Sequence, residues 1–321
     1  MARIMEVSAT RIYFRPVTPS LFRWGGEFTW VSRGPMSTGT SEPLPLPTTI
    51  IGALLGSKPG EELDGANVAI GKRLGCEDTV VLRGPYYPWH EGVAIHVYPK
   101  SLLLIDNAGR IRSLNVVEML MHKGTALNRV TKSVMKGLLY SIQLIDPEKL
   151  MEAGIVPEIS IDMLCRARVE RKVTKFGGEM RVALLGSDED AKLVKIIASL
   201  ASETRYFIVA SPILLDMDAK AELEKLLHGK EAKIDGCIMR PPSIEEVRRA
   251  VGEGGLVKRL RVRVEVMSPG VYGDTGLPRR PYLAILPGSL LLIECSDTTK
   301  FLNGIGRYHE IGFGTVVPIM L

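Results

Sequence analysis

The 321-residue chain lacks the features that define several common classes of protein. No apolar run is long enough to span a bilayer, and residues 1–8 contain Arg3 and Glu6 but no apolar signal core. We therefore expect a cytoplasmic protein without a membrane partner. The chain also has neither a GxGxxG turn between a strand and a helix nor a GxxxxGKS phosphate loop, which disfavours a nucleotide-binding fold.

Cysteine and the thermolabile amides are scarce. The four cysteines contain no CxxC pair that would indicate a metal or redox site, and we interpret them as reduced residues of the core: Cys76, Cys165, Cys237 and Cys295. A single glutamine and five asparagines are weakly typical of a thermophilic protein, although 13 methionines argue the other way.

Basic residues are concentrated in three stretches, although the net charge is only +5. Residues 1–41 hold five arginines against two glutamates, residues 119–145 hold no acid, and residues 166–181 hold six basic residues against two glutamates. Any one such stretch is usually solvated surface. Three of them together favour a polyanionic partner such as nucleic acid.

The N-terminal half predicts a strand, a long loop, a helix and a hairpin. Alternating residues predict a strand over 5–16, and Thr48 or Thr49 is the expected N-cap of the helix that follows the loop. The loop, residues 17–47, combines arginines with aromatic side chains that could stack on bases: Phe22, Trp24, Phe28 and Trp30. Residues 159–185 predict a β-hairpin that turns at 176–179 and presents one polar face of Arg166, Arg168, Glu170 and Lys172.

The C-terminal half has clearer helix signals. Ser187 with Asp190, and Ser243 with Glu246, resemble capping boxes, and a helix is expected over 218–227, closed by Gly229. Taken together, the segments predict an α+β fold of two tandem ferredoxin-like (RRM-like) domains with long loop insertions, over residues 1–190 and 191–321. Such domains leave one sheet face free to bind a nucleic-acid chain.

A glycine-rich loop leads into the last strand. Residues 304–314, GIGRYHEIGFG, hold four glycines. Glycine permits positive φ and close approach of another backbone, and such loops can present successive N–H groups to phosphates. Arg307 and His309 could add charge and stacking. A plain turn with a bulge is the alternative interpretation.

Four segments agree in order and spacing with one known family. They are Arg15-Pro16 to Phe22-Arg23 with Gly25-Gly26; residues 45–54, PLPTTIIGAL; residues 277–280, LPRR, followed by 284–289, AILPGS; and residues 304–314. Together they resemble the RAMP superfamily of CRISPR proteins, and within it the third subunit of the Cmr (type III-B) effector complex. The resemblance implies tandem ferredoxin-like domains, binding of the 5′ tag of the guide RNA (crRNA), and contacts with the large polymerase-like subunit and the backbone subunits.

We expect a non-catalytic RNA-binding subunit, with no cofactor and no metal. RNA cleavage without a metal usually needs a histidine as general acid or base, so the alternative, a guide-RNA-processing endoribonuclease of the same superfamily, would require His309, His90 or His96. A pure protein-interaction module is a further alternative. The residues predicted to contact RNA are Arg15, Arg23, Arg33, Thr48, Lys132, Arg166, Arg168, Lys172, Lys175, Arg279, Arg280, Gly304, Gly306, Arg307, His309, Gly312 and Gly314.

Overall fold

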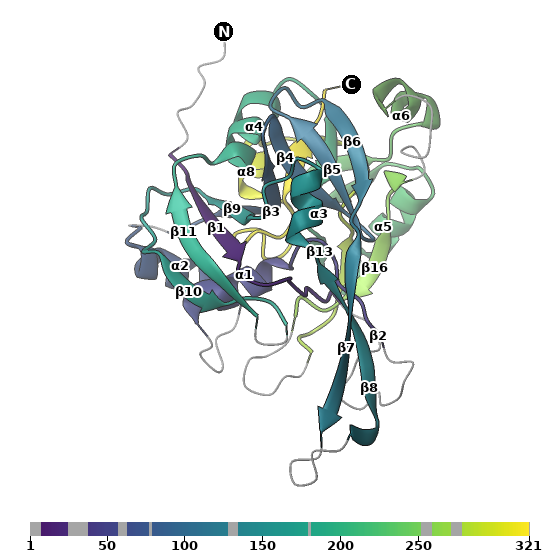
Figure 1. Cartoon of the computed structure of the whole chain (residues 1–321). Coiled ribbons are helices and arrows are strands. Elements are labelled where there is room, and N and C mark those ends of the chain that lie inside the picture. The colour runs from purple at the N-terminus through teal and green to yellow at the C-terminus, as the bar shows by residue number, and fades with distance from the viewer. Residues whose placement is uncertain are drawn as a thin grey trace.

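The chain has an α+β fold in which the sheets are mostly antiparallel and the helices are few (Figure 1). The structure is a computed structural model that describes residues 8–24, 38–56, 63–76, 79–127, 134–178, 181–251, 259–270 and 278–320. The predicted α+β class is confirmed. The helices are α1 (Pro47–Leu55), α2 (Ala66–Leu74), α3 (Pro147–Glu152), α4 (Lys192–Leu200), η1 (Met217–Ala219, a 3₁₀ turn), α5 (Lys220–Leu227), α6 (Ile244–Val251) and α8 (Thr299–Asn303).

The main sheet has eight strands in the order β10-β11-β1-β9-β3-β4-β5-β6. β1 lies between β11 and β9, so Ile12 stands opposite Ser187 on one side and Ile161 on the other. The sheet thus joins segments that are far apart in the chain. Its strands are β1 (Thr10–Pro16), β3 (Leu82–Trp89), β4 (Gly92–Val97), β5 (Ser101–Asp106), β6 (Ile111–Val116), β9 (Ile159–Met163), β10 (Lys172–Lys175) and β11 (Val182–Asp188).

The two faces of this sheet bury two different cores, because side chains alternate along each strand. Ile12, Phe14 and Ile161 belong to the core that α1 and α2 cover. Val93 and Ile95 face the other way and pack with α4 and the C-terminal sheets. Helix α4 therefore lies between the main sheet and the C-terminal half of the chain.

Two smaller sheets make up the C-terminal half. One has five strands in the order β14-β15-β18-β12-β19, and the other has three in the order β13-β17-β16. The bounds are β12 (Tyr206–Val209), β13 (Ile213–Leu215), β14 (Ala232–Ile234), β15 (Cys237–Arg240), β16 (Val264–Met267), β17 (Tyr282–Ile285), β18 (Leu290–Cys295) and β19 (Val316–Pro318).

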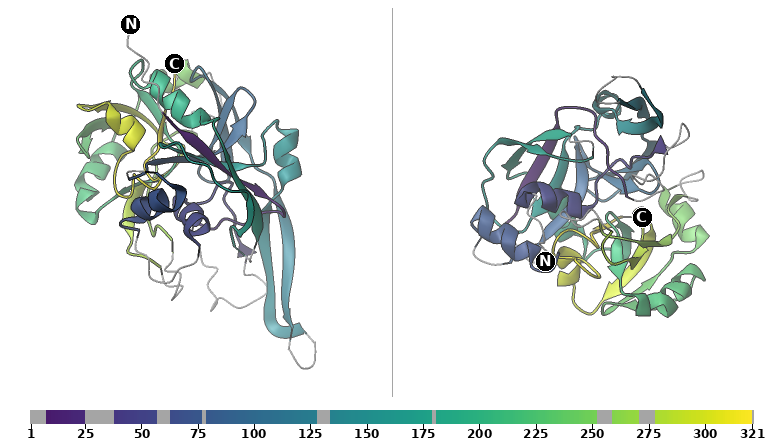
Figure 2. Two further views of the ribbon diagram at one scale, coloured as in Figure 1. Left: turned by 90° about the vertical axis from the view of Figure 1, so that its left-hand side faces the viewer. Right: turned by 90° about the horizontal axis from the view of Figure 1, so that it is seen from below.

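A two-stranded arm projects from this body. β7 (Met119–Leu127) and β8 (Val134–Ile145) are long paired strands that extend away from the other sheets in both side views (Figures 1 and 2). The short β2 (Thr38–Gly39) runs parallel to β8. The acid-free stretch of the sequence is thus an extended arm. None of the described helices has the length and apolar character needed to cross a bilayer.

The hairpin predicted over 159–185 is partly wrong. β9 pairs with β1 and β3, and only β10 and β11 form the hairpin, with their turn beginning at Phe176 as predicted. Residues 164–171 are irregular, so Arg166 and Arg168 do not share a strand with Lys172. The reason is burial: β9 is buried throughout and pairs with β1 and β3 inside the sheet, whereas β10 is mostly exposed at its edge.

Helix α1 begins two to three residues before the predicted start, because neither Thr48 nor Thr49 is its N-cap. Its N-cap is Leu46, Pro47 occupies the first turn, and no side chain caps the helix. The capping box predicted at Ser187 is also wrong, since the Ser187 hydroxyl accepts from Val169 N and α4 starts at Lys192. The box of Ser243 and Glu246 is confirmed by reciprocal hydrogen bonds of 3.2 and 2.6 Å.

The four cysteines form two disulfides, which contradicts the interpretation as reduced core residues. Cys76 pairs with Cys165, and Cys237 pairs with Cys295. Cys237 and Cys295 stand directly opposite each other on β15 and β18, whereas Cys165 follows β9 and Cys76 follows α2. Separations of 58 and 89 residues leave no local signal. Disulfides are common in secreted proteins and, among intracellular proteins, in those of hyperthermophiles.

Candidate nucleic-acid interface

A fully buried arginine holds the glycine-rich loop in place. Arg83, in β3, donates from Nη1 to His309 O at 2.9 Å, from Nε to Leu302 O and from Nη2 to Asn303 O. One guanidinium thus joins the residues just before the loop to the middle of the loop. Burial lowers the pKa of Arg83 to about 9, and the nearby charge of Glu310 opposes this. The group therefore remains charged at neutral pH.

The four loop glycines face the protein interior. An added Cβ at Gly304 would lie 2.6 Å from Arg83 Nη1, and one at Gly306 would lie 2.5 Å from Leu214 O. At Gly314 the Cβ would lie 1.8 Å from Ile305 O. All four have positive φ, from +61° at Gly314 to +104° at Gly312. The glycines are required by internal packing, and this accounts for them without an approaching phosphate.

The open side of the loop carries paired charges. Arg307 bonds the Asp216 carboxylate through Nε (2.6 Å) and Nη2 (2.5 Å), and Arg280 Nη2 lies 3.6 Å from the same group. These bonds raise the pKa of Arg307. Asp216 stands at the N-cap position of η1, but its side chain does not cap that turn. The carboxylate instead orients two guanidiniums and cancels one of their charges.

The pocket at this loop is more acidic than the sequence suggested. It has a volume of about 560 Å³, and Arg280, Arg307 and His309 are its basic members. Its acidic members are Asp64, Asp216, Asp218, Asp235 and Glu310. Polyanion binding at this point would therefore depend on the two arginines and on backbone donors at the rim.

Thr48 and Arg279 meet beside this loop. An added Cβ at Gly270 would lie 3.0 Å from Thr48 Oγ1, and Gly270 O accepts from Arg279 N at 2.9 Å. The first turn of α1 also reaches the loop, since a Cβ at Gly312 would lie 3.5 Å from Pro47 Cβ. The structure thus brings together predicted residues from three separate segments of the chain.

Other predicted residues lie elsewhere. Lys172 and Lys175 are exposed on β10, the outer strand of the sheet, next to α1 through the bond from Thr174 Oγ1 to Ala53 O. Arg15, at the end of β1, pairs with Glu158. Arg166 and Arg168 line a different cavity, on the side of α4. Arg23 is exposed and has an interaction partner. Two predicted residues lie outside the described residues: Arg33 and Lys132.

The aromatic cluster of the first loop is only partly available for stacking. Phe22 is buried against Phe176, so it belongs to the core. Trp24 donates from its indole nitrogen to Leu44 O at 2.7 Å and packs edge-on against His96. Phe28 and Trp30 lie outside the described residues.

The candidate catalytic histidines have structural partners. His309 Nδ1 lies 2.8 Å from Gly306 O within its own loop. His96 is fully buried and its Nε2 lies 3.0 Å from a carboxylate oxygen of Glu42, while the exposed His90 lies beside Glu91. In the described part of the chain, no three His, Cys, Asp or Glu side chains gather so as to hold a metal ion.

Two buried groups were missed by sequence reasoning. Arg83 lies in β3, whose other residues are uncharged. Asp162 lies in β9, where its carboxylate accepts hydrogen bonds from Tyr86 Oη (2.7 Å) and Val194 N (2.9 Å). Asp162 thereby caps α4 from a distant strand. Burial raises the pKa of Asp162 to about 7. A charged residue inside an alternating strand was the only signal available for either group.

The chain is similar to known proteins of the Cmr system. Over 279 residues it is 25% identical to the CRISPR system CMR subunit Cmr3 of Saccharolobus solfataricus, covering 78% of this chain and 86% of that protein. The resemblance to the third Cmr subunit is confirmed. No established protein-family profile matches the chain.

The structural similarity to Cmr proteins spans almost the whole chain. One solved relative is a chain of the type III-B Cmr-beta complex bound to cognate target RNA and AMPPnP, with a TM-score of 0.59, 18% identity and 96% of both chains covered. A second, from that complex bound to cognate target RNA, has the same TM-score and identity, with 95% of this chain and 96% of the other covered. The Cmr-like fold therefore includes both the main sheet and the C-terminal sheets.

Proposed function

We propose that the chain is a non-catalytic subunit of a type III-B CRISPR (Cmr) effector complex, built on tandem ferredoxin-like domains. In this proposal it anchors the 5′ tag of the guide RNA and docks the large polymerase-like subunit and the backbone subunits. The observation that carries the proposal is the match to Cmr proteins in both sequence and fold along most of the chain.

The exposed cations near α1 support RNA binding. Arg280 and Arg307 have side chains 66% and 63% exposed, and Asp216 holds both of them at the rim of the glycine-rich loop. Lys172 and Lys175 stand on the nearby outer strand and form no ion pair with any described residue. Phosphate oxygens are the natural partners of such guanidinium and ammonium groups. Lysines on an outer strand also discourage edge-to-edge aggregation, so their role needs a direct test.

The arrangement of His309 supports a non-catalytic role. Its Nδ1 is engaged by Gly306 O, the Arg83 guanidinium is tied to backbone carbonyls, and Arg280 and Arg307 are tied to Asp216. Cleavage would need a free imidazole beside a cation that stabilises the developing phosphorane charge. The alternative, a guide-processing endoribonuclease, is an outcome of the experiment below.

The first experiment is to purify the tagged chain from its native host and to sequence the RNA that accompanies it. Short RNAs that share one intact repeat-derived 5′ segment are expected. Random RNA or no RNA would contradict guide anchoring. Ends cut within the repeat, and lost in His309→Ala, would instead establish the endoribonuclease.

A matched pair of variants tests the binding face. Arg280→Ala should lower RNA affinity and reduce the slope of log affinity against log salt by about 0.7, the value for one single-strand phosphate contact. Arg205→Ala is the control, because Arg205 is 71% exposed and ion-paired with Glu294 on another sheet. Equal salt slopes in both variants would exclude Arg280 from the RNA-binding surface.

A further inference from the structure

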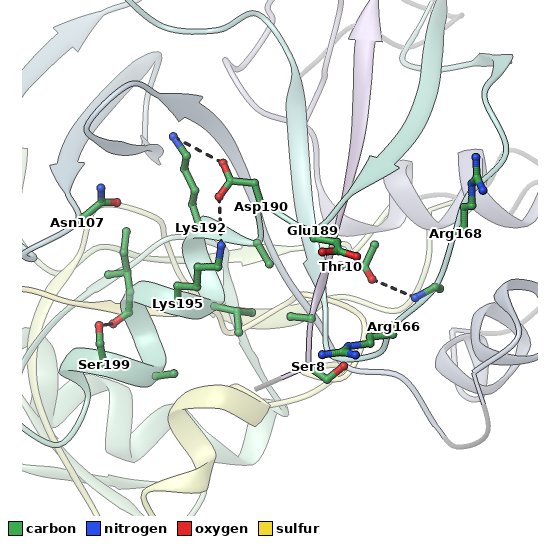
Figure 3. Close-up of a pocket in the computed structure, with 16 residues that line it drawn as sticks. Ser8, Thr10, Asn107, Arg166, Arg168, Glu189, Asp190, Lys192, Lys195 and Ser199 are labelled. Atoms are coloured by element: carbon green, nitrogen blue, oxygen red, sulfur yellow. Dashed lines mark hydrogen bonds and ion pairs between the residues drawn. The ribbon is translucent and has the colours of Figure 1, made fainter. Parts of the chain in front are cut away.

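A second cavity opens beside α4, with a volume of about 900 Å³ (Figure 3). Its walls are the solvent side of α4, the beginning of β1, the irregular segment after β9 and Asn107 from the β5–β6 turn. We call it the α4 cleft. It shares no lining residue with the pocket at the glycine-rich loop, so it is a separate feature of the surface.

The floor of the α4 cleft is apolar and is held by a hydrogen-bonded frame. The cleft is hollow because small side chains line it, among them Ala9, Ala167, Ala191 and Ala198. Ala167 N donates to Thr10 Oγ1 at 3.0 Å, and that hydroxyl donates to the backbone after β9 at 2.8 Å. A preformed apolar floor of this volume is typical of sites that receive a small molecule or a peptide segment.

The rim of the α4 cleft has an excess of positive charge. Arg166 and Arg168 are exposed and form no ion pair with any residue that the structure describes. Lys192 and Lys195 share Asp190, at 4.0 and 3.3 Å, as Figure 3 shows. Glu189 is the other acid of the rim. Four cations therefore face two carboxylates, and the unpaired cations are the two arginines.

We propose that the α4 cleft is a docking site for an acidic segment of a partner protein. Aliphatic side chains of that segment lie on the alanine floor, and its carboxylates pair with Arg166 and Arg168. Guanidinium groups bind carboxylates in a bidentate manner. Hydroxyl and amide groups on the walls, from Ser8, Asn107 and Ser199, are placed to bond the backbone of the segment.

The cleft is less suited to RNA. Among the residues that the structure describes, no aromatic side chain lines it, and single-stranded RNA relies on stacking of its bases against aromatic rings. Glu189 and Asp190 would repel a continuous phosphate backbone, whereas a peptide places its carboxylates only where the arginines are. This assignment moves Arg166 and Arg168 from the predicted RNA-contacting set to a protein interface. It does not depend on the proposed function of the glycine-rich loop.

Photo-crosslinking in the native host tests this proposal. The full chain carries p-benzoylphenylalanine in place of Ser199, on the wall of the α4 cleft, and the crosslinked product is identified by mass spectrometry. The control carries the same group in place of Glu224, an exposed residue of α5. A crosslink from the Ser199 position to an acidic, aliphatic protein segment is expected, with none to that segment from the Glu224 position.

Charge reversal then establishes the pairing. Arg168→Glu should reduce the crosslink yield about tenfold, the size of one interfacial charge pair, and a basic residue in place of the contacted acid should restore it. Arg205→Glu should leave the yield unchanged. A crosslink to RNA, a non-acidic crosslinked segment, no crosslink, or no response to charge reversal would each overturn the proposal. Sequencing the RNA of the same purification reports on guide binding separately.

Discussion

Replacing Arg83 would distinguish a loop-positioning role from an ordinary role in the core. In Arg83→Met the aliphatic stem remains, but the carbonyls of Leu302, Asn303 and His309 lose their donor. Two of these carbonyls lie just before the glycine-rich loop, and the third lies in its middle. The loop should therefore lose its order before the sheets unfold.

The expected energies can be worked out from the structure. Hydrogen bonds from a charged donor contribute about 1.5–3 kcal/mol each, so three contribute roughly 4–9 kcal/mol. Against this stands the cost of burying the charge. Burial lowers the pKa of Arg83 to about 9, and this shift corresponds to a cost of roughly 5 kcal/mol at about 1.4 kcal/mol per pH unit. The two terms nearly cancel, so Arg83→Met should lower the global free energy of unfolding by no more than about 4 kcal/mol. The lost hydrogen bonds are local to the glycine-rich loop.

Hydrogen exchange measures this difference. The amides of Ile305 and Arg307, which bond Gly314 O and Leu214 O, should exchange at least about tenfold faster in Arg83→Met than global destabilisation alone explains. Leu223→Ala is the matched control, because it removes a buried side chain of α5 at a cost of about 2–5 kcal/mol. Equal protection of the loop amides in both variants, after correction for global stability, would refute a positioning role for Arg83.

Three further predictions concern the remaining buried features. Replacing Cys76 and Cys165 by serine should lower the free energy of unfolding by about 4–5 kcal/mol, because their disulfide links residues 89 positions apart in the sequence. Four titratable thiols in the native protein without reductant would show that neither disulfide forms. Burial raises the pKa of Asp162 to about 7, so between about pH 4 and pH 7 the folded state holds a proton that the unfolded state has released. Stability should therefore fall as pH rises through this window, by up to about 1.4 kcal/mol per pH unit from this group, and parallel stability–pH profiles for wild type and Asp162→Asn would contradict this. Gly306→Val should reduce thermal stability and RNA affinity more than Arg259→Ala does, because the new Cβ meets a carbonyl at 2.5 Å; small and equal effects would show that the loop tolerates side chains.

Features that depend on a few neighbouring residues were predictable from the sequence. The helix over 218–227, the cap formed by Ser243 with Glu246, and the turn beginning at Phe176 are each decided by local hydrogen bonds and backbone preferences. The α+β class follows from the same kind of signal, summed over many elements. The resemblance to the third Cmr subunit rested on glycines and prolines, whose backbone conformations are encoded position by position.

Part of the candidate site was also predictable. The sequence indicated the glycine-rich loop, and it placed Thr48, Arg279 and Arg280 in segments that the structure does bring to that loop. It did not show why the glycines are needed, however, because positive φ and close approach serve equally for a phosphate and for the interior of the same protein. The packing around Gly304 shows that the interior requires a glycine there.

The sequence by itself determined the α+β class, several helices, the capping box of Ser243 with Glu246, the positions of the loop glycines and the family resemblance. Tertiary structure alone decided the pairing of the cysteines, the separation of Arg166 and Arg168 from the glycine-rich loop, and the burial of Arg83 and Asp162. The physical reason is distance along the chain: Arg83 acts on carbonyls more than 200 residues away. Interactions of that kind form only once the strands that carry the two residues have paired within their sheets.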